Sequence, residues 1–173
     1  KEQWFVKMDE LIKPAVEAVK SGDIQLIPER MEKYTPEVLK KIRKALNDQG
    51  KDFWCVLYSN QLEMDLTDFL ECFDGVSLWV WESETIPQLP QFFAKLKEIA
   101  PGKRYMLGVY LWEYNVKKPI DPKLFEQHIS QCFQLTLDKE IEGDAALLKE
   151  LNVEFRTAML SLPNLPDADL LPG

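Results

Sequence analysis

Two stretches of sequence decide the fold: Val76-Ser77-Leu78-Trp79-Val80-Trp81-Glu82 and Met106-Leu107-Gly108-Val109-Tyr110-Leu111-Trp112-Glu113-Tyr114. Each is apolar and aromatic, ends near a carboxylate and precedes a helix pattern, which predicts a buried strand that stops at its polar residues. If the two strands are parallel neighbours, both acidic ends emerge at one edge of one sheet. That edge is where open α/β sheets and (β/α) barrels place their ligand sites.

Strand and helix patterns alternate on either side of these stretches. Helices are predicted at 36–46, after 65, at 86–100, from 122 and from 152, and further strands at 24–27, 53–58 and 141–147. This rhythm predicts βαβ units and a mostly parallel sheet of about five strands. An eight-stranded barrel typically needs about 250 residues, so we expect an α/β fold that is a partial (β/α) barrel, with an open doubly wound sheet as the alternative.

The pattern also predicts three regions. Residues 1–33 form an opening helix and short strand, 34–162 form the β/α-repeat domain, and 163–173 form a loosely ordered tail rich in Pro, Asp and Leu. Thr35 is expected to cap the helix that starts at Pro36, and Asp65 to cap the short helix after it.

Composition excludes several classes of function. A net charge of −8 disfavours nucleic-acid binding, which needs a basic surface. We expect no membrane span and no signal peptide, because no apolar run has the required length or flanks. Cys55, Cys72 and Cys132 are far apart, which predicts buried thiols rather than a disulfide framework or a zinc site. Separate thiols favour a reducing compartment, and a secreted protein whose signal has been removed fits them too.

Glu82 and Glu113 are the candidate catalytic residues. Glycoside hydrolysis uses two carboxyl groups about 5–9.5 Å apart, and neighbouring strands lie roughly 4.8 Å apart. Flat apolar rings pack against sugar faces. The candidate substrate-binding rings are Tyr58, Trp81, Trp112 and Tyr114.

Side-chain alternation argues against this pair. Along the first stretch Ser77 and Trp79 share one face, and Glu82 shares the other face with the aliphatic residues that normally meet helices. Glu113 stands on the aliphatic face of the second stretch in the same way. Both glutamates reach a central site only if the strands end before them; otherwise they are surface carboxylates.

Other chemistry has little support. His128 is the only histidine, and no serine or cysteine motif accompanies it, so we interpret it as a packing or helix-surface residue. The sequence offers no metal-ligand cluster and no G-x-G-x-x-G or Walker loop. We therefore predict no metal and no cofactor.

The opening residues resemble a segment of valyl-tRNA synthetase. The resemblance is carried by Gln3–Met8, Lys13–Ala15, Glu17–Gly22, Pro28–Arg30 and Glu32–Lys33. In that family the segment belongs to the catalytic region after the editing insertion. The family's next, tryptophan-rich stretch and its ATP-holding H-I-G-H and K-M-S-K-S signatures are absent from these 173 residues. The resemblance implies shared local structure without aminoacylation.

From Tyr34 onward the chain resembles the C-terminal half of barrel domains in uncharacterised glycoside-hydrolase-like proteins. The features are Leu78–Trp81, Pro101–Lys103, Gly108–Tyr114, Lys118–Pro119 and Ile141–Gly143. Such domains often carry an aspartate where Glu113 stands, so the carboxylate is kept with a longer reach.

Three functions follow. The first is a carbohydrate-active, glycoside-hydrolase-like domain with its site at the strand ends. The second is a non-catalytic module, or barrel fragment, whose open sheet edge is covered by a partner or a second copy in a homo-oligomer. The third is a fragment derived from a class I tRNA synthetase without aminoacylation activity.

Overall fold

A computed structural model describes residues 2–7, 35–113 and 116–143 of the 173-residue chain. The chain divides into two compact units. Unit 1 comprises Lys1–Trp81 and Pro90–Gly108, and unit 2 comprises Glu82–Leu89 and Val109–Gly173. The boundaries predicted near residues 33 and 162 fall outside the described residues.

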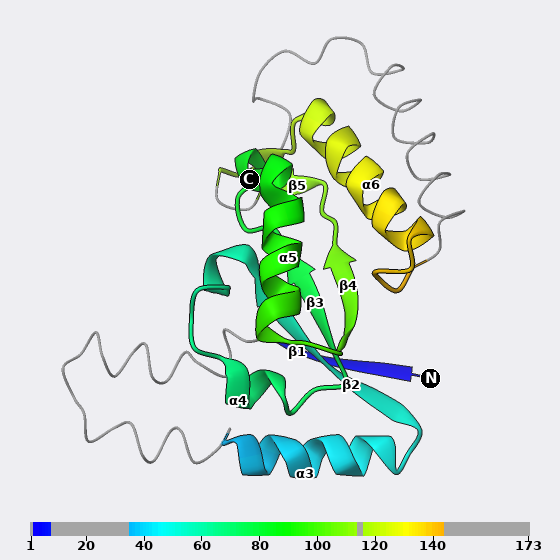
Figure 1. The fold of residues 1–173 in the computed structure, drawn as a ribbon. Helices are drawn as coiled ribbons and strands as arrows, with labels where there is room; N and C mark the ends of the chain where they lie inside the picture. Colours follow the sequence, from blue (N-terminus) through cyan, green and yellow to red (C-terminus); the bar gives the residue numbers. More distant parts are fainter. Residues whose placement is uncertain (1, 8–34, 114–115, 144–173) are drawn as a thin grey trace, which may run out of the picture. The chain divides into compact units, whose positions relative to one another are not determined.

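Unit 1 is built on a four-stranded parallel sheet (Figure 1). Its strands are β1 (Glu2–Lys7), β2 (Lys51–Tyr58), β3 (Gly75–Trp79) and β4 (Arg104–Gly108), in that spatial order. The two stretches that decide the fold are therefore parallel neighbours, with Gly75 opposite Arg104 and Trp79 opposite Gly108. This confirms the predicted α/β class and its parallel sheet.

Helices connect the strands of unit 1. They are α3 (Pro36–Asn47), η2 (Ser59–Gln61), α4 (Thr67–Leu70) and α5 (Leu89–Ile99), the last starting one residue inside unit 2. The hydroxyl of Thr35 accepts from Val38 N–H at 3.4 Å, so the predicted cap of α3 is confirmed. The predicted cap at Asp65 is wrong: Leu66 occupies the N-cap of α4 without a side-chain hydrogen bond, and burial of its side chain anchors that end instead.

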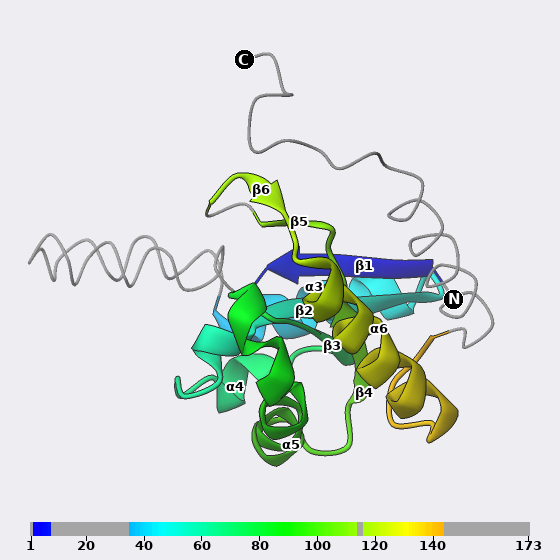
Figure 2. The same ribbon diagram turned by 90° about the horizontal axis from the view of Figure 1, so that it is seen from above.

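One face of the sheet is aliphatic and meets the helices. The side chains of Cys55, Leu57, Val76 and Leu78 on this face are buried. On β4 the ring of Tyr105 meets Phe93 of α5 edge-on, with 5.5 Å between centroids. Figure 2 shows β1 at one edge of unit 1, with β2 and β3 between β1 and α5. The prediction that the aliphatic face meets helices is correct.

The opposite face carries tryptophans that lie over glycines of the next strand. The Trp54 ring covers Gly75, and the Trp79 ring covers Gly108, so closely that a Cβ atom at either glycine would overlap the ring. The guanidinium of Arg104 lies 5.1 Å from the Trp54 ring centroid. Trp79 also donates from Nε1 to Ser77 Oγ at 3.1 Å. The small residues of one strand therefore accommodate the large rings of its neighbour.

Unit 2 contains η3 (Ser83–Gln88), the hairpin of β5 (Trp112–Glu113) and β6 (Lys118–Pro119), and α6 (Pro122–Leu137). Asp121 caps α6 by accepting from the N–H groups of Lys123 and Leu124. Phe125, Ile129 and Cys132 are buried along α6, as their spacing predicts, and α6 packs against η3.

Three predicted strands need correction. The first stretch leaves the sheet after Trp79, because Trp81 N–H donates to Ser59 Oγ instead. The second leaves it after Gly108, and Trp112–Glu113 pairs antiparallel with Lys118–Pro119 because its backbone finds partners in the following hairpin. Of the strand predicted at 141–147, residues 141–143 are not a strand, and residues 144–147 lie outside the described residues. The predicted strand at 24–27 lies outside the described residues, whereas β1 was not predicted.

Candidate functional site

The end of β2 in unit 1 brings two predicted rings together. Tyr58 and Trp81 meet edge-to-face with centroids 5.0 Å apart. The hydroxyl of Ser59 accepts from Trp81 N–H at 2.9 Å, which ties the residues after β3 to the end of β2. Trp81 remains 41% exposed, so part of this aromatic pair faces solvent.

In unit 2, Glu113 is held from two sides. Its Oε1 accepts a hydrogen bond from Ser83 Oγ at 2.7 Å, and its Oε2 lies 4.0 Å from Lys118 Nζ. Residues 113 and 118 face each other across the β5–β6 pair, which places the lysine. The Glu113 side chain is only 10% exposed. The orientation of a carboxylate this enclosed, with a hydroxyl and an ammonium group beside it, is restricted.

Glu82 has a different environment. It is exposed, stands at the N-cap of η3, and its carbonyl accepts from the N–H and hydroxyl of Thr85. Its neighbour Ser83 touches Glu113, so the loop after β3 brings the two glutamates into one region of unit 2. Glu82 comes after the end of β3, and Glu113 comes after the end of β4. The side-chain alternation along those two strands therefore does not fix the direction of either glutamate.

Tyr110 lies near the same carboxylate. Burial, together with the negative charges of Glu113 and Glu84, raises the pKa of Tyr110 to about 12. The phenol therefore stays neutral at physiological pH and can donate or accept a hydrogen bond. Trp112 is half-buried on β5, and the predicted Tyr114 lies outside the described residues.

Sequence reasoning missed Ser83 and did not assign a role to Tyr110 or Lys118. Ser83 lies 30 residues from Glu113 and belongs to no spacing motif. The sequence places Tyr110 only in the middle of the second stretch, with no motif around it. A hairpin predicted over residues 112–119 would have placed Lys118 opposite Glu113. The continuous aromatic run up to Tyr114 instead indicated one long strand without a turn.

His128 is a buried packing residue of α6. Its side chain is 1% exposed, and neither ring nitrogen has a hydrogen-bond partner. Burial lowers the pKa of His128 to about 4, so the ring is neutral at pH 7. Within the residues that the structure describes, no His, Cys, Asp and Glu side chains group as a metal site would require.

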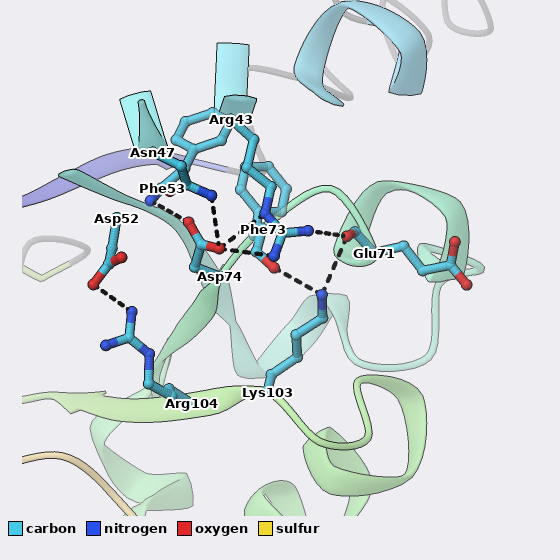
Figure 3. Close-up of polar contacts among 9 residues, drawn as sticks. All are labelled: Arg43, Asn47, Asp52, Phe53, Glu71, Phe73, Asp74, Lys103 and Arg104. Carbon is cyan, nitrogen blue, oxygen red and sulfur yellow. Dashed lines mark hydrogen bonds and ion pairs between the residues drawn. The ribbon is translucent and has the colours of Figure 1, made fainter. Parts of the chain in front are cut away.

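The opposite ends of the strands carry a second polar cluster, which is structural (Figure 3). Asp74 accepts from Phe53 N–H at 2.8 Å and from Arg43 Nε at 2.9 Å. Burial opposes ionisation of Asp74, but these donors outweigh it and lower the pKa of Asp74. Lys103 donates to the carbonyls of Glu71 and Phe73. Such contacts at strand N-termini hold a sheet together, whereas ligand sites lie at the C-terminal ends.

None of the helices described in the structure is both long and apolar enough to cross a membrane.

Comparison with known proteins finds similarity to valine–tRNA ligases over short stretches. The chain is 46% identical over 54 residues to the ligase of Dehalococcoides mccartyi (strain CBDB1), covering 31% of this chain and 5% of the ligase. It is 64% identical over 31 residues to the Clostridium tetani ligase (18% and 4%) and 40% identical over 55 residues to the Coxiella burnetii ligase (32% and 5%).

The other two comparisons are negative. No protein-family model matches the chain, and no solved structure matches it. The chain spans about 5% of the length of the Dehalococcoides mccartyi ligase that it matches. The expected resemblance to valyl-tRNA synthetase is therefore confirmed for part of the chain, whereas nothing supports the resemblance to glycoside-hydrolase-like domains.

Proposed function

We propose that part of this chain is derived from valyl-tRNA synthetase and that these 173 residues do not charge tRNA. The identity to valine–tRNA ligases over 54 residues carries the first half of the proposal. The second half rests on the absence of the H-I-G-H and K-M-S-K-S signatures from these residues. Without those residues the chain has no counterpart of the family's ATP-holding site.

The charge distribution supports the same proposal. A net charge of −8 repels phosphates. Lys40, Lys41 and Lys44 give α3 an exposed basic side, but Arg43 on the same helix is engaged internally by Asp74 at 2.7 Å. A few exposed lysines on an acidic chain are typical of a solvated helix face.

A charging assay tests this proposal. The chain is incubated with ATP, labelled valine and tRNA, beside an intact valine–tRNA ligase as the positive control. We expect no labelled tRNA above the blank. Charging by the 173-residue chain would refute the proposal.

A second candidate function is a carbohydrate site in unit 2. The enclosed Glu113 is the observation that favours it, because Ser83 donates to its carboxylate, Lys118 lies 4.0 Å from Oε2, and the exposed Glu82 belongs to the same unit. Glycosidases use two carboxyl groups in two environments. The sequential strand order of unit 1 is also the order of a (β/α) barrel, although the barrel, the sugar and the catalytic pair remain proposals.

Titration with sugars tests this second candidate. Tryptophan fluorescence is recorded while oligomers of glucose, xylose, mannose and N-acetylglucosamine are added. We expect saturable quenching by at least one oligomer, and weaker binding by Glu113→Gln. Glu140→Gln, which changes an exposed carboxylate after α6, serves as the control. No quenching by any oligomer would refute this function.

A further inference from the structure

The strand order of unit 1 places its helices on one face of the sheet. The strands follow one another in space as they do in sequence, and all three neighbouring pairs are parallel. Crossovers between parallel strands are right-handed, so crossovers that all step in the same direction carry their helices to the same side. This is the aliphatic side, where Phe93 of α5 meets Tyr105. The opposite face, which carries Trp54 and Trp79 and is named the tryptophan face, receives no helix from these crossovers.

Side chains of β2 and β4 meet over β3 on the tryptophan face. A guanidinium nitrogen of Arg104 on β4 lies 2.6 Å from a carboxylate oxygen of Asp52 on β2. The same guanidinium lies over the ring of Trp54, and β3 contributes only Gly75 to that row. Layers supplied by alternate strands, and large side chains set against small ones, are features of the interior of a small barrel.

Apolar side chains of the two outer strands are partly exposed on this face. Phe5 of β1 stands opposite Trp54, with 6.0 Å between the ring centroids, and its side chain is 48% exposed. Met106 of β4 stands opposite Ser77 and is half-buried. Purely parallel sheets occur almost only with both faces covered, and burial of such side chains stabilises whatever covers them. The tryptophan face therefore has the character of an interface.

We propose that the tryptophan face is the interior of an eight-stranded parallel barrel formed by two copies of this chain. β1 and β4 each have one strand neighbour in the described sheet. A two-fold axis along the strands keeps all eight strands parallel and sets β4 of each copy beside β1 of the other, which makes two identical seams. Eight strands enclose an interior that side chains just fill. A different partner would have to supply four parallel strands of the same tilt, whereas a second copy supplies them by symmetry.

The oligomeric state of the whole chain tests this proposal. Sedimentation equilibrium is measured for the original chain, which we expect to be a dimer, and for Phe5→Asp and Met106→Lys, one on each outer strand. Each variant loses two apolar side chains per dimer and places two charges in the interior, so the Kd of the dimer should rise roughly a hundredfold or more. The control is Leu137→Asp, which changes a side chain of α6 that is 52% exposed, and it should leave this Kd unchanged.

Hydrogen exchange of the original chain gives a readout that does not depend on how the variants fold. Amides of β1 and β4 should exchange more slowly at concentrations above the Kd than below it, because both strands gain a neighbour at the seams. A monomeric original chain, or a dimer whose β1 and β4 amides gain no protection, would overturn the proposal. So would a folded Phe5→Asp variant that dimerises as tightly as Leu137→Asp. Open filaments would also contradict it, because they require an interface that does not close.

Discussion

Replacing Gly108 with alanine tests how the sheet of unit 1 is packed. A Cβ atom at this position would overlap the six-membered ring, the five-membered ring and Nε1 of Trp79. Carbon atoms pack at about 3.5–4.0 Å, so the indole has to move. Trp79 stands directly opposite Gly108 in the β3–β4 pair, and its Nε1 donates to Ser77 Oγ at 3.1 Å.

The expected cost follows from these contacts. Overpacking a well-packed region costs about 1–3 kcal/mol, and loss of the bond to Ser77 adds about 1 kcal/mol. We expect Gly108→Ala to lower the free energy of unfolding by about 2–4 kcal/mol. For a chain of this size that corresponds to a fall in Tm of roughly 4–16 °C.

Urea unfolding followed by circular dichroism measures this cost. A double-mutant cycle identifies its cause, because Gly108→Ala should cost much less when Trp79→Leu has already removed the ring. A cost below about 1 kcal/mol, or an equal cost with and without Trp79, would refute the packing described for this face.

Two other perturbations have expected outcomes. Asp74→Asn removes the charge that pairs with Arg43 at 2.7 Å, and we expect the free energy of unfolding in urea to fall by about 1–2 kcal/mol. The exposed Lys44–Asp48 pair provides the control, because Asp48→Asn should lower it by less than about 0.5 kcal/mol. Equal losses in the two variants would contradict the structural role of Asp74. The pKa of His128 is lowered to about 4. Below pH 6.5 the imidazole therefore binds a proton in the unfolded chain but not in the folded chain, and the free energy of unfolding falls as the pH drops. Between pH 7 and pH 5 this contributes about 2 kcal/mol, which His128→Leu should remove from the pH dependence of unfolding. An unchanged slope would show that the pKa of His128 is the same in the folded and the unfolded chain.

The fold was predictable from two properties of the sequence, which are the length of its apolar runs and the spacing of its apolar residues. Continuous apolar runs such as Phe53–Tyr58 and Val76–Val80 identify buried parallel strands. Thr35-Pro36 marks the start of a helix, because the hydroxyl of the capping threonine and the fixed φ of the proline depend only on neighbouring residues. The strand ends were harder to place. They depend on where backbone groups find partners, and Trp81 N–H finds one 22 residues away in Ser59.

The candidate site was predictable only in outline. The sequence predicted Glu82 and Glu113 as a pair because parallel strands bring their ends to one edge, and their role in a site remains a prediction. The Ser83–Glu113 contact was not predictable, because it joins residues 30 positions apart. The hairpin that carries Glu113 was missed for a related reason: an alternating aromatic run fits one long strand and two short ones equally well.

We propose that part of this chain shares its origin with valyl-tRNA synthetase but does not have the synthetase's activity. A graft tests it most directly: the matching residues of this chain replace those of the Dehalococcoides mccartyi ligase, and charging of tRNA with valine is measured for the graft and for the 173-residue chain. We predict that the graft charges tRNA and that the chain alone does not. A folded graft without activity, or charging by the chain alone, would contradict the claim.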